Sequence, residues 1–132
     1  MKKVPSFKKK YLEGRDMLFG SLIKNNNGVL FNKSHGNLVD QLIIEIVKDI
    51  QITFPVSDFC LIAVGGYGRH DLSPKSDVDL LFIYKKSNKN IRVFITQLNN
   101  TVWDIGLEVV IYLLKIKQAL IDSKKDIKTI TK

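Results

Sequence analysis

The stretch VGGYGRHDLSPKSDVDLLFIY, from Val64 to Tyr84, decides how the rest of the chain is interpreted. It begins where an apolar run from Phe59 stops at two glycines, and it ends in a second apolar run that carries two aspartates at its start. Short apolar runs bounded by glycine and polar residues are typical of strands. The stretch therefore predicts a strand, a glycine turn, a short polar helix and a second strand.

The two aspartates, Asp77 and Asp79, are expected to point to one side of the sheet, because side chains alternate along a strand. Leu81 and Ile83 share that side, and the opposite side is formed by Val78, Leu80, Phe82 and Tyr84. Two residues span about 6.6 Å along a strand, which suits carboxylates that flank divalent cations about 3.5 to 4 Å apart. The pair therefore predicts a site for two metal ions.

The two glycines, Gly65 and Gly66, predict the other half of a phosphate-transfer site. Glycine can adopt positive φ and lets a ligand approach the backbone closely. The N–H groups that open the following helix form an anion site, so a nucleoside triphosphate is expected there. The alternative is a tight strand-to-helix turn followed by solvated aspartates.

The run GGYGRHDLSPKSDVDLL, from Gly65 to Leu81, resembles the nucleotidyltransferase motif of the protein-PII uridylyltransferases. These are bifunctional regulators of nitrogen metabolism in the DNA polymerase β-like superfamily. A second block, WDIGLEV from Trp103 to Val109, resembles the family's segment after the next helix. The resemblance covers roughly positions 59 to 110 and implies an α/β (α+β) polymerase β-like nucleotidyltransferase fold, with a small mixed sheet backed by helices.

The resemblance also implies the residues of the site. Two Mg²⁺ (or Mn²⁺) ions would be held by the catalytic acids Asp77, Asp79 and Glu108, and the nucleotide would be bound by Gly65, Gly66, Arg69 and Ser76. UTP would be the donor, a PII tyrosine the acceptor and pyrophosphate the leaving group. Glu108 could instead be a solvated strand-end residue or pair with Arg69, and Asp104 is the rival third acid.

Three departures from the family pattern stand out. His70 occupies a place where the family commonly has a small residue, and Asp71 a place where it has glutamate. After the Gly-Leu-Glu-Val segment the family continues with a polar run, Gly-His-Ser-Val-Arg-Thr, whereas this chain reads VIYLLK from Val110 to Lys115. The polar end of that strand is therefore expected to be missing.

The rest of the chain divides into three parts: an N-terminal basic arm and helix (1–36), a nucleotidyltransferase core (37–114) and a lysine-rich tail (115–132). We expect a helix over residues 11–23, stopped by NNNG at 25–28, then a loop to residue 35 and a helix capped by Asn37 that ends before Pro55. Apolar spacing predicts a further helix over 91–102. A continuously apolar strand follows at 107–114, expected to be buried on both faces.

Composition limits the class of protein. A chain of 132 residues makes one domain, and because the family's enzymes are several times longer, the chain is interpreted as a truncated version. The net charge of +8 arises from lysines gathered at both ends, so solvated termini explain it better than nucleic-acid binding. Membrane spans and a leader peptide are not expected, which predicts a cytoplasmic protein. Cys60 is expected to be a buried residue without a disulfide partner, and His35 to have no catalytic role.

Three functions follow as hypotheses. The first is a nucleotidyltransferase of uridylyltransferase type, active alone or with a partner chain. The second is a small stand-alone nucleotidyltransferase with another acceptor. The third is a catalytically weak remnant that only binds nucleotide or a partner protein.

Overall fold

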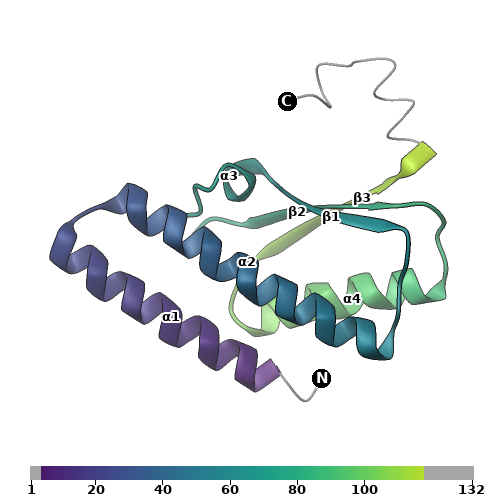
Figure 1. The fold of residues 1–132 in the computed structure, drawn as a ribbon, viewed down its shortest axis with the longest axis horizontal. Coiled ribbons are helices and arrows are strands. Elements are labelled where there is room, and N and C mark those ends of the chain that lie inside the picture. Colours follow the sequence, from purple (N-terminus) through teal and green to yellow (C-terminus); the bar gives the residue numbers. More distant parts are fainter. Residues whose placement is uncertain (1–3, 118–132) are drawn as a thin grey trace.

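The computed structural model of the chain describes residues 4 to 117 (Figure 1). Its elements follow in the order α1 (Val4–Asn25), α2 (Gly28–Thr53), β1 (Phe59–Val64), α3 (Gly65–Gly68), β2 (Val78–Tyr84), α4 (Lys89–Asp104) and β3 (Val109–Lys115). The expected strand, glycine turn and second strand are confirmed. The short polar helix expected after the turn is not formed, because the glycine segment itself makes the helical turn α3 and residues 69–77 contain no helix. The expected tail lies outside the described residues from position 118 onward.

The strands form one mixed sheet in the order β1-β2-β3, as expected for this fold class. β1 runs antiparallel to β2, with Val64 opposite Asp79. β2 runs parallel to β3, with Val78 opposite Val109 and Asp79 opposite Val110. A parallel pair needs a crossover connection, and α4 supplies it. This arrangement brings the end of β1 and the starts of β2 and β3 to one end of the sheet.

Helices α1, α2 and α4 all lie on one side of the sheet, below it as drawn in Figure 1. The core therefore contains alternate strand residues, among them Val78, Leu80 and Phe82 of β2, which are at most 2% exposed. Phe82 stacks on Phe59 at a ring-centroid distance of 5.1 Å and packs against Phe94 of α4 at 5.9 Å. The predicted alternation along β2 is confirmed.

The other face of the sheet carries no helix among the described residues, and this corrects two expectations. β3 is not buried on both faces: it is an edge strand in which Val110 and Tyr112, on the face away from the helices, are 37% and 51% exposed. Cys60 of β1 is exposed, not buried. Both expectations fail for the same reason. An apolar run is buried on two sides only where a second layer covers the sheet, and no such layer covers this face.

The start of α2 also differs from the sequence prediction. The helix begins at Gly28 and not near Asn37, because the Asn27 side chain accepts a hydrogen bond from the Leu30 N–H at 3.0 Å and so caps it. The expected loop before His35 is therefore helical. Asn26, at φ 50°, makes the turn between α1 and α2. α2 crosses the expected boundary at position 37 without a break, and the division of the chain into three parts stays a prediction.

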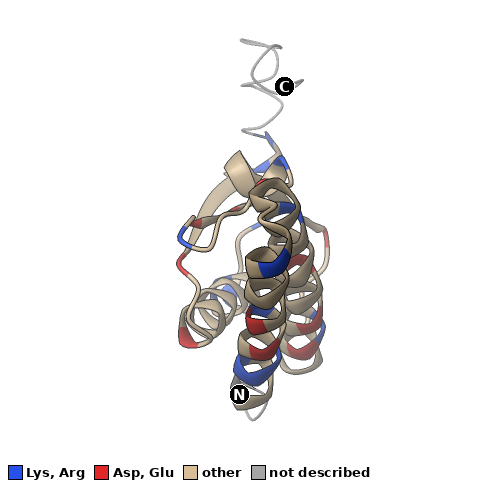
Figure 2. Cartoon of the chain, turned by 90° about the vertical axis from the view of Figure 1, so that its left-hand side faces the viewer, with Lys and Arg blue, Asp and Glu red and all other residues tan. Residues whose placement is uncertain are grey.

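Helix α1 begins at Val4 and not at residue 11, so the basic start of the chain is helical from Val4 onward. Lysines and acids are interspersed on α1 and α2 in Figure 2. Lys10 of α1 pairs with Glu45 of α2 at 3.0 Å, both on the surface, so part of the positive charge is balanced locally. In the described range no helix is long and apolar enough to cross a membrane.

His35 is fully buried between α1 and the loop that follows the glycine turn. Its Nδ1–H donates to the Leu72 carbonyl at 3.0 Å, which leaves Nε2 to accept from the Tyr11 hydroxyl at 2.8 Å. Burial lowers the pKa of His35 below its usual value, which favours the neutral ring; the Leu72 and Ser73 backbone opposes this shift, and the nearby Arg15 adds a smaller lowering. The role is structural.

This network predicts a loss of stability in mild acid. Because His35 has a lowered pKa when folded, its stabilising contribution is complete above the unfolded pKa of about 6.5 and is lost as the pH falls toward the folded value. The slope approaches about 1.4 kcal/mol per pH unit for one proton. Urea unfolding from pH 7.5 to 5.5 should show it for the wild type but not for His35→Asn.

His70, the second histidine of the chain, is exposed and provides the matched control. His70→Asn should keep the wild-type pH dependence. An unchanged slope in His35→Asn, or a lost slope in His70→Asn, would contradict the assignment.

Candidate active site

The glycine turn follows β1 directly. Its three glycines, Gly65, Gly66 and Gly68, each occupy a position where a side chain would be unfavourable, for different reasons. Gly65 has φ +64°, a conformation that side chains disfavour. A Cβ on Gly66 would lie 3.1 Å from the Asp71 carbonyl oxygen, and one on Gly68 only 2.5 Å from that of Ala63. Gly68 is therefore required for the fold of the turn, whereas Gly65 borders the site itself.

Asp79 lies beside this turn. It stands opposite Val64 in the sheet and is half-buried. Its Oδ2 would lie 2.7 Å from a Cβ placed on Gly65, so the bare backbone of Gly65 leaves the space that the carboxylate uses. The predicted neighbourhood of the glycine turn and the aspartates is present in the structure.

Asp77 and Glu108 are brought together by the pairing of β2 and β3. The Val78 N–H donates to the Glu108 carbonyl at 2.8 Å, which aligns the residues that precede the two strands. A hydrogen bond with the Asp77 carboxyl, followed by repulsion from its charge, raises the pKa of Glu108. Both side chains are exposed, so the expectation that Glu108 opens a buried strand is wrong, because β3 begins one residue later.

Asp104, the rival third acid, is the last residue of α4 and is also exposed. Glu108 is the acid that meets Asp77. Within residues 4–117, however, no three carboxylate, histidine or cysteine side chains converge as a ready-made metal site. The structure thus gives a carboxylate pair, Asp77 and Glu108. Asp79 follows Asp77 by two residues at the start of β2.

The other predicted nucleotide-binding residues lie around the turn. Arg69 is exposed, with one guanidinium nitrogen 3.9 Å from the position of a Cβ on Gly66. The hydroxyl of Ser76 forms a hydrogen bond with that of Ser73, and its N–H donates to the Ser73 carbonyl at 3.2 Å. Ser76 therefore fixes the turn before Asp77, while Arg69 is available to a ligand.

Helix α2 holds the whole stretch in place, which the sequence did not reveal. The Tyr67 hydroxyl donates to the Asp40 carboxylate, and the Asn32 amide donates to Asp71 at 2.8 Å. Burial, and then the contact with Asp40, raises the pKa of Tyr67. Asn32, His35 and Asp40 all project from α2 toward this stretch. Their spacing in the sequence could have indicated a shared helix face, but the start of α2 was expected ten residues later.

Comparison with known proteins identifies the family. The sequence model of the nucleotidyltransferase domain matches residues 41–132, which is more than half of the chain. The chain belongs to the nucleotidyltransferase domain family. No solved structure matches it significantly.

Among curated nucleotidyltransferases, the chain is similar to proteins named bifunctional uridylyltransferase/uridylyl-removing enzyme. The protein from Pseudoalteromonas translucida is 34% identical over 83% of this chain and 12% of its own length. That from Pseudomonas fluorescens is 29% identical over 97% of this chain and 14% of its own length. The Pseudomonas aeruginosa protein is 40% identical over 57% of this chain. The matched part covers 8% of the Pseudomonas aeruginosa protein, so the chain spans about 8–14% of the length of these relatives.

One departure from the family pattern has a structural meaning in this nucleotidyltransferase domain. His70 has φ +59°, in the left-handed region that favours glycine. Among small residues only glycine, which has no Cβ, would avoid the strain. His70 is exposed and lies just before the Asp71 contact with α2.

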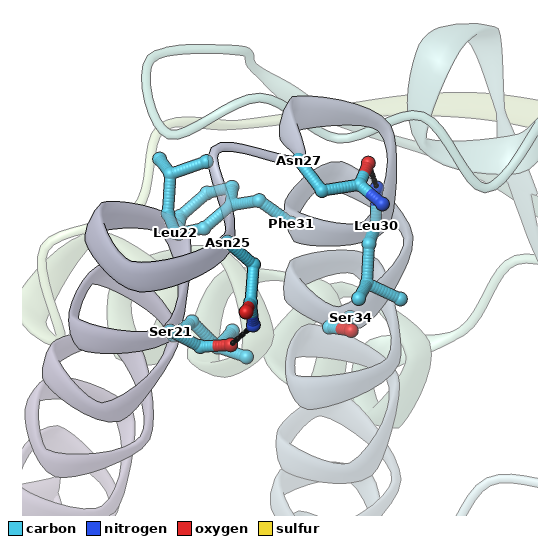
Figure 3. A pocket seen from close by; sticks show the side chains of 8 residues that line it. Ser21, Leu22, Asn25, Asn27, Leu30, Phe31 and Ser34 are labelled. Carbon is cyan, nitrogen blue, oxygen red and sulfur yellow. Dashed lines mark hydrogen bonds between the residues drawn. The ribbon is translucent and has the colours of Figure 1, made fainter.

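A small hollow at the turn between α1 and α2 lies apart from these acids (Figure 3). It measures about 40 Å³ and is lined by Leu18, Ser21, Leu22, Asn25, Asn27, Leu30, Phe31 and Ser34. The Asn25 amide donates to the Ser21 hydroxyl at 3.2 Å, and Asn27 caps α2, so the polar groups serve the turn itself. The hollow has no charged group and is not a candidate active site.

The glycine constraints predict a ranking of stability. Gly65→Ala should cost roughly 1–2 kcal/mol because of its positive φ, and the new Cβ should displace the Asp79 carboxylate. Gly68→Ala should cost more, since its Cβ meets a backbone carbonyl that cannot rotate away. Gly20→Ala, in α1 with nothing within 4 Å, should instead stabilise by about 0.5–1 kcal/mol.

Urea unfolding of the three variants measures this ranking. Equal stability of Gly68→Ala and Gly20→Ala would contradict the described turn.

Proposed function

We propose that the chain carries the nucleotidyl-transfer site of a uridylyltransferase, which moves UMP from UTP to a hydroxyl group of a PII-type signalling protein. The observation that carries the proposal is the exposed pair of Asp77 and Glu108, held together by the β2–β3 register next to Asp79 and the glycine turn. Such a group of acids beside a backbone anion site suits metal-dependent phosphoryl chemistry.

The residues fit divalent cations by their chemistry. Magnesium and manganese prefer oxygen ligands, and the site supplies carboxylates only. The contact that raises the pKa of Glu108 places two like-charged groups together, and a cation beside them would relieve their repulsion. Asp77, Asp79 and Glu108 are therefore the proposed ligands of Mg²⁺ or Mn²⁺.

Each residue then has a proposed task. The backbone around Gly65 and Gly66 and the guanidinium of Arg69 bind the phosphate groups. Asp77, Asp79 and Glu108 would hold Mg²⁺, which would supply charge stabilisation to the phosphate and lower the pKa of the acceptor hydroxyl when bound. The acceptor hydroxyl gives its proton to water as its oxygen bonds to the α-phosphorus, the bond from that phosphorus to the oxygen that bridges to the β-phosphorus breaks, and pyrophosphate leaves.

UTP is proposed as the donor because the similar proteins are named for uridylyl transfer. The PII-type acceptor, and with it a part in nitrogen regulation, follows from the sequence resemblance. A cytoplasmic location is proposed because nucleoside triphosphates and such signalling proteins occur there.

Metal-dependent nucleotide binding is the first consequence. UTP titrated in the presence of Mg²⁺ should bind the wild type at least about tenfold more tightly than without metal, a difference of about 1.4 kcal/mol. Asp79→Asn should lose this gain, because an amide holds the cation more weakly. Asp104→Asn, which removes the exposed acid at the end of α4, is the matched control and should keep it. Equal affinities in all cases would rule out the metal site.

Transfer itself is expected to be slow in the isolated chain. An attacking hydroxyl must lie within about 3 to 3.5 Å of the phosphorus, and a displacement of about 1 Å can cost 10²-fold in rate. The residues assigned above hold phosphate and metal, but none is assigned to uracil or to the acceptor. In a mixture of labelled UTP, Mg²⁺ and a PII protein, the chain should label the PII protein at a rate about 10²-fold lower than the full-length Pseudomonas fluorescens relative does. Labelling at an equal rate would contradict this expectation.

A further inference from the structure

A groove of about 430 Å³ lies between α2 and the outer strand β1, on the helix side of the sheet. Its floor is formed by Leu61 and Ala63 of β1, and its wall by Ile44 and neighbouring residues of α2. Ile44 is 47% exposed although it faces other apolar groups. Ile44 and the apolar floor give a second molecule a shaped surface to pack against.

The adjoining edge of β1 is unprotected. In the described sheet β1 pairs with β2 alone, so one row of its backbone N–H and C=O groups has no strand partner. Outer strands in stable monomers usually carry lysine, proline or a bulge that discourages pairing. The sequence of β1 is FCLIAV, with no charge and no proline. Both the edge and the groove therefore favour a protein partner.

The charges on the groove identify that partner. Asp40 and Lys48 both line it, and they lie four residues before and four residues after Ile44 on the same face of α2. A two-fold axis that passes close to Ile44 would set Ile44 against the partner's Ile44. It would also set Lys48 against the partner's Asp40, and the reverse on the other side. A self-complementary patch of this form is what an isologous interface requires.

We propose that the β1 edge and the α2 groove form the interface of a homodimer with two-fold symmetry. The β1 strands of the two copies would lie side by side and antiparallel, so that the sheets join across the axis. The Asp40 carboxylate keeps its bond from the Tyr67 hydroxyl, because a carboxylate has acceptor positions left for the partner's Lys48.

The open face of the sheet is the competing surface, and its charges argue against it. That face carries Asp79 together with exposed apolar side chains such as Ile62 and Tyr112. A second copy packed there would remove the half-buried carboxylate of Asp79 from water without a cation of its own, which is costly. A dimer across β1 leaves Asp77, Asp79 and Glu108 open to solvent.

Sedimentation velocity of the full chain over about a hundredfold range of concentration tests the proposal. The wild type should reach twice its chain mass of 15.1 kDa. Lys48→Glu should raise the dimer dissociation constant by at least about tenfold, because two attractive pairs become repulsive. Ile44→Glu should prevent dimerisation. Its circular dichroism should match that of the wild type, and so should its urea midpoint at a concentration low enough for the wild type to be monomeric, because Ile44 is 47% exposed.

Tyr112→Glu is the matched control, because it places the same new charge on the open face of the sheet, where Tyr112 is 51% exposed. Its dissociation constant should equal that of the wild type. A wild type that stays monomeric at every concentration would overturn the proposal. So would a dimer that dissociates in Tyr112→Glu and is unaffected by Lys48→Glu.

Discussion

The parallel register between β2 and β3 is the constraint on which the candidate site depends. The hydrogen bond from the Val78 N–H to the Glu108 carbonyl aligns the residues just before the two strands. It brings together two acids that are 31 positions apart in the sequence, Asp77 and Glu108, and their contact raises the pKa of Glu108. A shift of one residue would turn one of these side chains to the helix side of the sheet, and the pair would be lost.

A second set of contacts fixes the glycine turn relative to this register. In helix α2, the Asp40 carboxylate accepts a hydrogen bond from the Tyr67 hydroxyl, and the His35 ring donates one to the Leu72 carbonyl. Tyr67 is 4% exposed and His35 is fully buried, so the turn and the loop up to Leu72 are fixed to α2. Pre-organisation of this kind lets backbone groups bind an anion without a further loss of conformational entropy.

The sequence predicted most of the strands and the alternation along β2, because glycines and period-two apolar patterns are local signals. It did not predict the start of α2, since NNNG can both end one helix and cap the next, and Asn27 does the second. It also did not predict that β3 and Cys60 are exposed, because an apolar run does not show whether a second layer covers it. The residue types of the site could be predicted, whereas the contacts of Asp40 and His35 with the motif depend on tertiary structure.

We propose that Asp77, Asp79 and Glu108 form one divalent-cation site beside the glycine turn. Paramagnetic broadening of backbone amide NMR signals by Mn²⁺ tests it most directly, because the effect falls steeply with distance from the bound ion. The account predicts that the signals of Gly65, Val78 and Val109 broaden first, and that Asp77→Asn removes the effect. Broadening centred elsewhere in the chain, or none that depends on these acids, would contradict it.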